Sequence, residues 1–262
     1  MTPNYIFIDI DMTLWDEHWI IPESTKAALA AAVSRGNKIF INTGRSRSNV
    51  HENGIEDLPW SGYVCACGGH IEMDGEILRE VLIPYDILMK ALNTFKDHGM
   101  PAVVEGRDLH FINLDDFPGD TYVHSLWDKL GQYVKPLSEM TANDAINKYS
   151  ANISSQKDLA ECYDLLKDDL DFIDHNNSVV EVIPKGLSKA NGIQWLMDRF
   201  GIPAENIYAI GDGMNDYEMI SFARHGIAMG NANPKIKEIA EYVTDDIHAD
   251  GLYKAFLHYG LT

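Results

Sequence analysis

The chain has 262 residues, of which 45% are hydrophobic, so it can bury a large core in one large domain or two ordinary ones. Its 21 Lys and Arg against 40 Asp and Glu give a formal net charge of -19, which argues against nucleic acid or an anionic membrane as a partner. No segment has the length of a membrane span or the layout of a secretion signal, so we expect a cytoplasmic protein.

The chain contains three cysteines, Cys65, Cys67 and Cys162. This number is odd and small for the length, which argues against a disulfide framework. The Cys-x-Cys pair has no second pair of ligands at zinc spacing. We therefore predict buried free thiols.

The first predicted strand, at residues 5–8, is apolar and leads directly into Asp9 and Asp11. Because side chains alternate along an extended chain, the two carboxylates can point to the same side. No Lys or Arg lies within this stretch to relieve their repulsion. A bound cation is the expected remedy.

An alternation of helices and strands follows. We predict a helix from Glu23 to about residue 32, a strand at residues 38–42, a turn at Thr43-Gly44-Arg45 and a further strand at residues 63–67. A second helix would begin at Ser46 or Ser48. This order indicates a parallel sheet with right-handed crossovers, in which Thr43 ends a strand as Asp9 does.

The pattern changes near residue 80 and returns near residue 184. After a hairpin at 71–78, helices at 85–96 and 157–167 are expected among strands at 102–105, 109–113, 149–153 and 179–183. Beyond them the α/β alternation resumes, with a helix at 188–200 and strands at 207–210, 226–229 and 242–244. We predict an α/β fold in which a Rossmann-like parallel sheet core, residues 1–82 and 184–262, is interrupted by an α+β domain at 83–183.

A second acidic group, Gly211-Asp212-Gly213-Met214-Asn215-Asp216, directly follows the predicted strand at 207–210. Each carboxylate taken alone could belong to a solvated turn. In an open α/β sheet, however, ligands bind at the carboxyl ends of the strands, where Asp9 and Asp11 are also expected. Carboxylates that converge there form an oxygen site suited to Mg²⁺ and to phosphate oxygens.

Four segments together resemble the motifs of the haloacid dehalogenase superfamily. They are Asp-x-Asp-x-Thr at 9–13, Thr43-Gly44-Arg45, Lys189 within Leu-Ser-Lys-Ala at 187–190, and Gly-Asp-Gly-Met-Asn-Asp at 211–216. The hairpin before a long insert, the Lys-Gly-x-Ser-Lys stretch at 185–189 and the Asp-Gly-Leu at 250–252 are similar to the Cof-like phosphatase branch. In that family the insert is a cap domain that determines substrate specificity.

The resemblance implies an Mg²⁺-dependent phosphatase of small phosphate monoesters, such as sugar or cofactor phosphates. Asp9 would be the nucleophile that forms an aspartyl-phosphate, and Asp11 the general acid and base, a role that needs a raised pKa. Thr43 would bind a phosphoryl oxygen and Lys189 would neutralise charge. The resemblance also implies substrate contacts for Thr43, Gly44, Arg45 and Asn215. It implies an Mg²⁺ site made by Asp9, Asp11 (through its carbonyl), Asp212, Asn215 and Asp216, in which the last two lie behind the direct ligands.

Three positions depart from the family pattern or compete with it. Met12 stands where glycine is usual, which leaves the shape of that loop open, and Cys67 replaces an asparagine of the Cof-like branch. Lys185 is an alternative to Lys189 as the ammonium group. We favour Lys189 because Ser188 can cap the helix that begins there and because the family motif places the lysine at that helix start.

Other functions fit the same residues. A phosphomutase could pass the phosphoryl group back to a sugar, a phospho-acceptor switch could present it to a partner, and a non-catalytic binding module could keep the motifs without turnover. The oligomeric state is open. Candidate specificity residues in the insert are Glu105, Arg107, His110, Asp115, His175 and Asn176.

Overall fold

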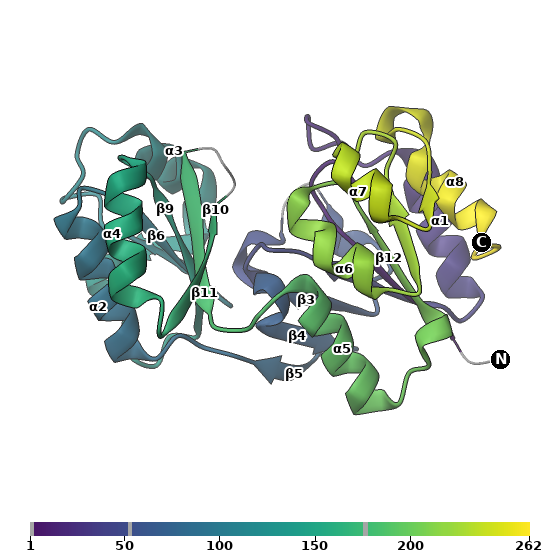
Figure 1. Cartoon of the computed structure of the whole chain (residues 1–262), viewed down its shortest axis with the longest axis horizontal. Coiled ribbons are helices and arrows are strands. Elements are labelled where there is room, and N and C mark those ends of the chain that lie inside the picture. The colour runs from purple at the N-terminus through teal and green to yellow at the C-terminus, as the bar shows by residue number, and fades with distance from the viewer. Residues whose placement is uncertain (1–2, 52–53, 175–177) are drawn as a thin grey trace. The chain divides into compact units, whose positions relative to one another are not determined.

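A computed structural model describes residues 3–51, 54–174 and 178–262 of the chain. The chain forms two compact units (Figure 1). The first comprises Met1–Arg45, Asn49–Arg79 and Leu187–Thr262, and the second comprises Ser46–Ser48 and Glu80–Gly186. In the described part of the chain, no helix is both long and apolar enough to cross a bilayer.

The first unit is built on a sheet with strand order β14-β13-β12-β1-β2-β3-β4-β5 within the described residues. All neighbours from β14 to β3 pair in parallel, and β4 returns antiparallel to β3. The strands are β1 (Tyr5–Ile8), β2 (Lys38–Asn42), β3 (Gly62–Cys65), β4 (His70–Met73), β5 (Glu76–Glu80), β12 (Ile207–Gly211), β13 (His225–Ala228) and β14 (Tyr242–Val243). The predicted Rossmann-like α/β fold is therefore confirmed.

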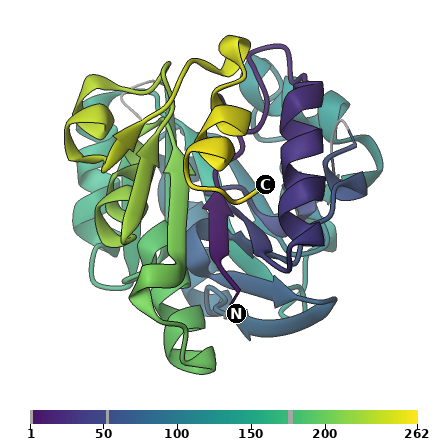
Figure 2. The ribbon, with the colours of Figure 1, turned by 90° about the vertical axis from the view of Figure 1, so that its right-hand side faces the viewer.

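Helices cover this sheet on both faces (Figure 2). Helices α1 and α8 contact each other, whereas α6 contacts both α5 and α7. Their bounds are α1 (Glu23–Ser34), α5 (Lys189–Phe200), α6 (Tyr217–Phe222), α7 (Pro234–Ile239) and α8 (Gly251–His258). The apolar residues that α1 buries are spaced three and four apart, as a helix with one face on a sheet requires, and include Ala28, Leu29 and Ala32.

Strand β1 lies in the middle of the sheet, between β12 and β2. Ile6, Phe7 and Ile8 are fully buried there. A strand covered on both faces has to be apolar throughout, which explains why this segment shows no polar alternation. The first residues able to carry charge are those just beyond its carboxyl end.

The second unit has its own sheet, with strand order β10-β11-β9-β6-β7-β8 in the described residues. Its strands are β6 (Ala102–Gly106), β7 (His110–Ile112), β8 (Val134–Pro136), β9 (Ile146–Asn152), β10 (Leu170–Asp174) and β11 (Val179–Pro184), and its helices are α2 (Tyr85–Asp97), α3 (Thr121–Leu130) and α4 (Gln156–Leu166). Val104 of β6 packs with the residues of α2 and α4, whereas its neighbour Val103 packs with α3. The two faces of the sheet therefore carry separate apolar cores.

Two local expectations were wrong, and strands β8 and β10 and helix α3 were not predicted. Only short 3-10 turns, Arg47–Asn49 and Ile55–Asp57, occur in the described residues where a helix from Ser46 or Ser48 was predicted. Strand β3 stops at Cys65 instead of Cys67 because the next residues turn into the left-handed region. Helix α3 was not predicted, although its start is capped by Asp120. The three cysteines are buried thiols, as expected.

Candidate active site

Three strand ends meet at one edge of the first unit's sheet. Asp9 follows β1, Thr43 follows β2 and Asp212 follows β12, and these strands are parallel neighbours. The backbone N–H of Asp9 donates to the carbonyl of Ile210 at 3.0 Å, so the pairing continues one residue beyond the strand. The polar residues that the sequence placed after strands therefore lie at the edge where α/β sheets bind ligands.

Lys189 supplies the positive charge at this edge. It is the first residue of α5, where the Ser188 side chain caps the helix by accepting from the N–H of Asn191. Its Nζ donates to Asp9 Oδ1 and to Asp216 Oδ1, each at 2.6 Å. Burial opposes its charge, but the carboxylates of Asp216 and Asp9 outweigh burial and raise the Lys189 pKa, so the ammonium stays charged.

Lys185, the alternative ammonium group, lies elsewhere. It belongs to the second unit, where its Nζ donates to Asp171 Oδ1 at 3.0 Å. Both side chains are about half exposed to solvent. Of the two lysines, only Lys189 contacts Asp9 in the structure.

Carboxylate oxygens of Asp9, Asp212 and Asp216 lie within 4.8 Å of one another. Asp216 is saturated with donors, because its Oδ1 accepts from Lys189 and its Oδ2 accepts from the N–H groups of Asp212 and Gly213 at 2.9 Å. Asp9 and Asp212 each accept one side-chain hydrogen bond from the described residues, to a single oxygen. The second oxygens of Asp9 and Asp212 are therefore the atoms best placed for a cation, with Asp216 holding the loop and Lys189 in position.

The acids repel one another in the absence of a cation. Burial, and then the charge of Asp216, raise the Asp9 pKa well above its ordinary value. The same two causes raise the Asp212 pKa to about 7. Three carboxylates share one ammonium group here, so the residues fit a divalent cation with hard oxygen ligands such as Mg²⁺.

This repulsion predicts that Asp212→Asn stabilises the metal-free protein. The pKa of Asp212 is higher in the folded protein than in the unfolded chain, so its carboxyl group lowers the free energy of unfolding as the pH rises from about 4 to about 7. Above pH 7 the whole of this loss in stability remains. The gain in unfolding free energy from Asp212→Asn should therefore be larger at pH 8 than at pH 5, by roughly 2–3 kcal/mol. Urea unfolding in chelator at both pH values measures it. The exposed Asp86→Asn serves as the control, and an equal gain from Asp212→Asn at the two pH values would contradict the assignment.

Asp11 is held away from this cluster by three donors. Arg45 Nε donates to its Oδ2 at 3.0 Å, Arg45 Nη2 donates to its Oδ1 at 2.7 Å, and Trp15 Nε1 donates to the same Oδ1 at 3.0 Å. The guanidinium group also lies over the Trp15 ring, 5.1 Å from its centroid. Burial would raise the Asp11 pKa, but the hydrogen bonds and charge of Arg45 outweigh it and lower this pKa. Without a metal ion the Asp11 pKa is therefore lowered, the opposite of the direction that the expected acid role needs.

The other predicted site residues have different surroundings. Thr43 is buried and its Oγ1 accepts from the Arg45 N–H at 3.1 Å, across Gly44. Asn215 is exposed, and among the described residues its side chain makes no hydrogen bond with the acids. Met12 has a φ of 59°, a left-handed conformation in which glycine is less strained, which accounts for the family preference at this position.

Sequence reasoning missed two contacts at the site. Thr13 Oγ1 donates to Asp212 Oδ1 at 2.9 Å, and Asn42 Nδ2 donates to the Lys189 carbonyl at 3.1 Å. Thr13 was visible as the last residue of Asp-x-Asp-x-Thr. Asn42 carried a signal as well, because a polar residue at the end of a buried apolar strand needs a partner.

The second unit places the candidate specificity residues in different settings. Glu105 and His110 are buried, and Glu105 accepts from Ser46 Oγ at 3.1 Å. Arg107 pairs with Glu80 at 2.8 Å and with Asp108 at 2.9 Å. His175 and Asn176 lie outside the described residues.

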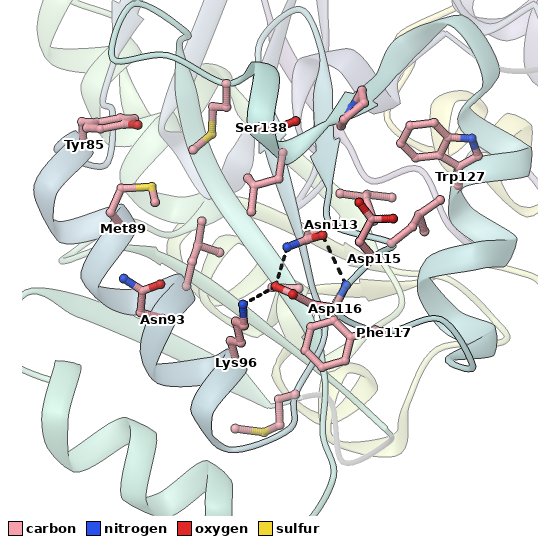
Figure 3. Close-up of a pocket in the computed structure, with 18 residues that line it drawn as sticks. Tyr85, Met89, Asn93, Lys96, Asn113, Asp115, Asp116, Phe117, Trp127 and Ser138 are labelled. Carbon is pink, nitrogen blue, oxygen red and sulfur yellow. Dashed lines mark hydrogen bonds and ion pairs between the residues drawn. The ribbon is translucent and has the colours of Figure 1, made fainter.

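Asp115 lines a cavity of about 650 Å³ within the second unit (Figure 3). The wall combines apolar and polar side chains, and an ion pair joins Lys96 to Asp116 at 2.5 Å, where Asn113 also donates to Asp116. None of the residues predicted for phosphoryl transfer lines this cavity. It is a feature of the second unit alone.

The comparisons with known proteins agree with this geometry. The family model of the haloacid dehalogenase-like hydrolases matches residues 6–256. The putative phosphatase YkrA of Bacillus subtilis is 28% identical, over 100% of this chain and 99% of its own. YcsE of the same organism, a 5-amino-6-(5-phospho-D-ribitylamino)uracil phosphatase, is 27% identical over 98% of this chain and 95% of its own. The solved structure of the subclass IIB sugar phosphatase BT4131 has a TM-score of 0.83 at 28% identity, covering 99% of this chain and 100% of that one.

In this chain the central strand of a parallel sheet ends in an acid paired with a lysine, and the relatives that it matches along its length are named as phosphatases. The chain belongs to the haloacid dehalogenase-like hydrolase family. The resemblance to its Cof-like branch and the assignment as a phosphoric monoester hydrolase are both confirmed.

Proposed function

We propose that the protein is an Mg²⁺-dependent phosphatase that hydrolyses small phosphate monoesters through an aspartyl-phosphate on Asp9. The observation that carries the proposal is the buried contact between Lys189 and Asp9 inside the carboxylate cluster. Phosphoryl transfer needs positioning and charge neutralisation more than it needs covalent chemistry from the protein. A buried ammonium group beside a carboxylate with one open oxygen meets both needs.

Different residues of the chain would carry out different parts of the phosphoryl transfer. An oxygen of Asp9 would attack phosphorus as the bond to the leaving oxygen breaks, and Lys189 would neutralise charge on Asp9 and the phosphoryl group. Mg²⁺, held by the Asp9 and Asp212 carboxylates and the Asp11 carbonyl, would supply further positive charge and keep Asp9 ionised. Thr43 would hydrogen-bond a phosphoryl oxygen. Asn215 would contact the substrate and would lie behind the direct ligands of the metal.

Asp11 would give its proton to the leaving oxygen and later take one from the attacking water. In the structure every partner of its carboxylate is a donor, and the charge of Arg45 favours the ionised form of Asp11 over the carboxylic acid. Asp11 therefore has to leave Arg45 before it can act as an acid. A phosphoryl group is a suitable replacement partner for Arg45, since guanidinium groups bind carboxylate and phosphate oxygens in the same forked geometry.

The substrate class follows from the relatives. BT4131 is described as a sugar phosphatase, and YcsE as a phosphatase of a compound that carries a phosphorylated ribityl chain. We infer that this protein also acts on a small polyhydroxylated phosphate ester, selected by the inserted domain at 83–183 as a cap. A cytoplasmic location remains a prediction from the sequence.

A panel of phosphate monoesters tests the function. With Mg²⁺ present, sugar and sugar-alcohol phosphates should be hydrolysed and phosphodiesters should not. Activity should disappear in chelator and return when Mg²⁺ is added, because the single ammonium group of Lys189 does not balance three carboxylates. Full activity after rigorous removal of metal would contradict the metal requirement. Phosphoryl transfer to a second sugar hydroxyl with no release of inorganic phosphate would indicate a mutase.

A further inference from the structure

The first turn of α5 is held at a fixed distance from the end of β3 by a contact between two glycines. A Cβ on Gly192 would lie 2.5 Å from Val64 Cγ1 and 3.1 Å from Gly68 Cα. A Cβ on Gly68 would lie 2.8 Å from the carbonyl oxygen of Ser188 and 2.9 Å from the Gly192 nitrogen. No side chain fits on either residue unless the Val64 side chain or the two backbones move.

This contact adjoins the residue that neutralises Asp9. Gly192 is three residues after Lys189 on the same helix, and its N–H donates to the Ser188 carbonyl at 3.1 Å. The Lys189 side chain is almost completely buried and reaches two carboxylates at 2.6 Å. Because the ammonium group has so little freedom, a shift of the helix start shifts it relative to Asp9.

The other partner, Gly68, ends a strained turn. Ala66 and Cys67 have φ values of 48° and 52°, and Gly68 has a φ of 84°. Left-handed backbone is unfavourable for residues with a Cβ and concentrates at functional sites. The N–H groups of Ala66 and Cys67 donate to the carbonyls of Arg45 and Thr43 at 2.7 and 3.2 Å. One turn therefore contacts both the Thr43–Arg45 loop and the start of α5.

Glycine at position 192 has no advantage for the helix itself. It is a poor helix former, and the φ of Gly192 is not in the left-handed region that requires glycine. The close approach of Val64 and of Gly68 is what demands the absence of a Cβ at position 192 in the described structure. We propose that the Gly68–Gly192 contact is a spacer that positions Lys189 against Asp9, an inference that rests on the proposed function.

Gly192→Ala tests the spacer, because alanine favours the helix while its methyl group pushes α5 away from β3. We expect kcat to fall about 10–100-fold, since a misplacement on the order of 1 Å can cost about 100-fold in rate. KM should change less than about threefold. Gly68→Ala should act in the same direction. The control is Gly75→Ala. Gly75 has a similar left-handed backbone (φ of 81°), but a Cβ added there would have no atom within 4 Å, so this variant should keep native kcat.

A rescue experiment separates positioning from simple loss of stability. Val64→Ala removes the atom nearest to the new methyl group, so adding it to Gly192→Ala should restore most of kcat. The same change deletes buried methyl groups, and Val64 is fully buried, so it should lower Tm in both backgrounds. A double variant that is more active yet less stable than Gly192→Ala supports the spacer. Native kcat in Gly192→Ala, or no recovery in the double variant, overturns it.

Crystal structures of the native protein and of Gly192→Ala test the spacer independently of enzymatic activity. The contact between Lys189 Nζ and Asp9 Oδ1, 2.6 Å in the native structure, should lengthen or break in the variant. An unchanged contact would overturn the inference even if kcat fell. A native protein that hydrolyses no phosphate ester would count against the proposed function, while the structural comparison would still decide on the spacer.

Discussion

Asp9→Asn is expected to abolish phosphoenzyme formation and to reduce turnover by a factor on the order of 10⁴–10⁶. The amide keeps the shape of the side chain but is not a nucleophile, and it is a weaker ligand for Mg²⁺ than a carboxylate. The loss should not come from unfolding. Burial and the charge of Asp216 raise the pKa of Asp9, so removing its charge should stabilise the metal-free protein instead.

Acid quenching of the reaction on the millisecond scale, followed by mass spectrometry of peptides, measures this prediction. Native protein should carry phosphate on Asp9 during turnover, and the Asn variant should carry none. Thermal unfolding in chelator provides the control, in which the variant should be at least as stable as the native protein. Phosphate found on Asp11, or a phosphoenzyme in Asp9→Asn, would show that the two acids have the opposite roles.

Much of this site could be predicted because few arrangements of parallel strands are compatible with the sequence. An apolar strand that ends in acids, a second that ends in Thr43 and a third that ends in Asp212 have to bring their carboxyl ends to one edge when the strands pair in parallel. The choice of Lys189 over Lys185 rested on the cap that Ser188 provides, which the structure contains, and on the place of the lysine in the family motif. The convergence of the acids needed only the order of the strands, whereas the roles of Thr43 and Lys189 came from the resemblance.

The sequence was not sufficient to predict which side chains pair at the site. Asp9 and Asp11 look alike in the motif, yet one points to Lys189 and the other to Arg45 and Trp15. Which partner each acid takes depends on rotamers and on a loop that starts with Met12 in a left-handed conformation. The expectation of a raised Asp11 pKa rested on an Asp9 kept ionised by Mg²⁺, and the sequence did not indicate that Arg45, 34 residues away, takes Asp11 as its carboxylate partner.

Helix α3 was missed for a different reason. Its inward residues, Val123, Leu126, Trp127 and Leu130, have helical spacing, and Asp120 caps its start by accepting from two N–H groups. The polar and aromatic residues between them weakened the pattern against the surrounding strands. The cap and the spacing taken together would have been sufficient to predict the helix.

Asp11→Asn should differ from Asp9→Asn in which step it slows. Its proposed metal contact is a backbone carbonyl, which the substitution keeps, and the nucleophile is untouched. The amide oxygen can still accept from Arg45 or Trp15, so the loop should keep its conformation. Turnover should nevertheless fall by a factor on the order of 10²–10⁴, because no group remains to protonate the leaving oxygen or to activate water.

The dependence on the leaving group identifies the lost step. An aryl phosphate with an acidic phenol needs little protonation, so Asp11→Asn should still form phosphoenzyme from it and accumulate that intermediate, since water attack lacks its base. An alkyl phosphate such as a sugar phosphate needs the proton and should show the larger loss in kcat/KM. Rapid-quench measurements with both substrates, on native protein and on Asp11→Asn, test this. Equal losses for the two substrates, with no accumulated phosphoenzyme, would mean that Asp11 serves to hold Arg45 in place and that another group transfers the proton.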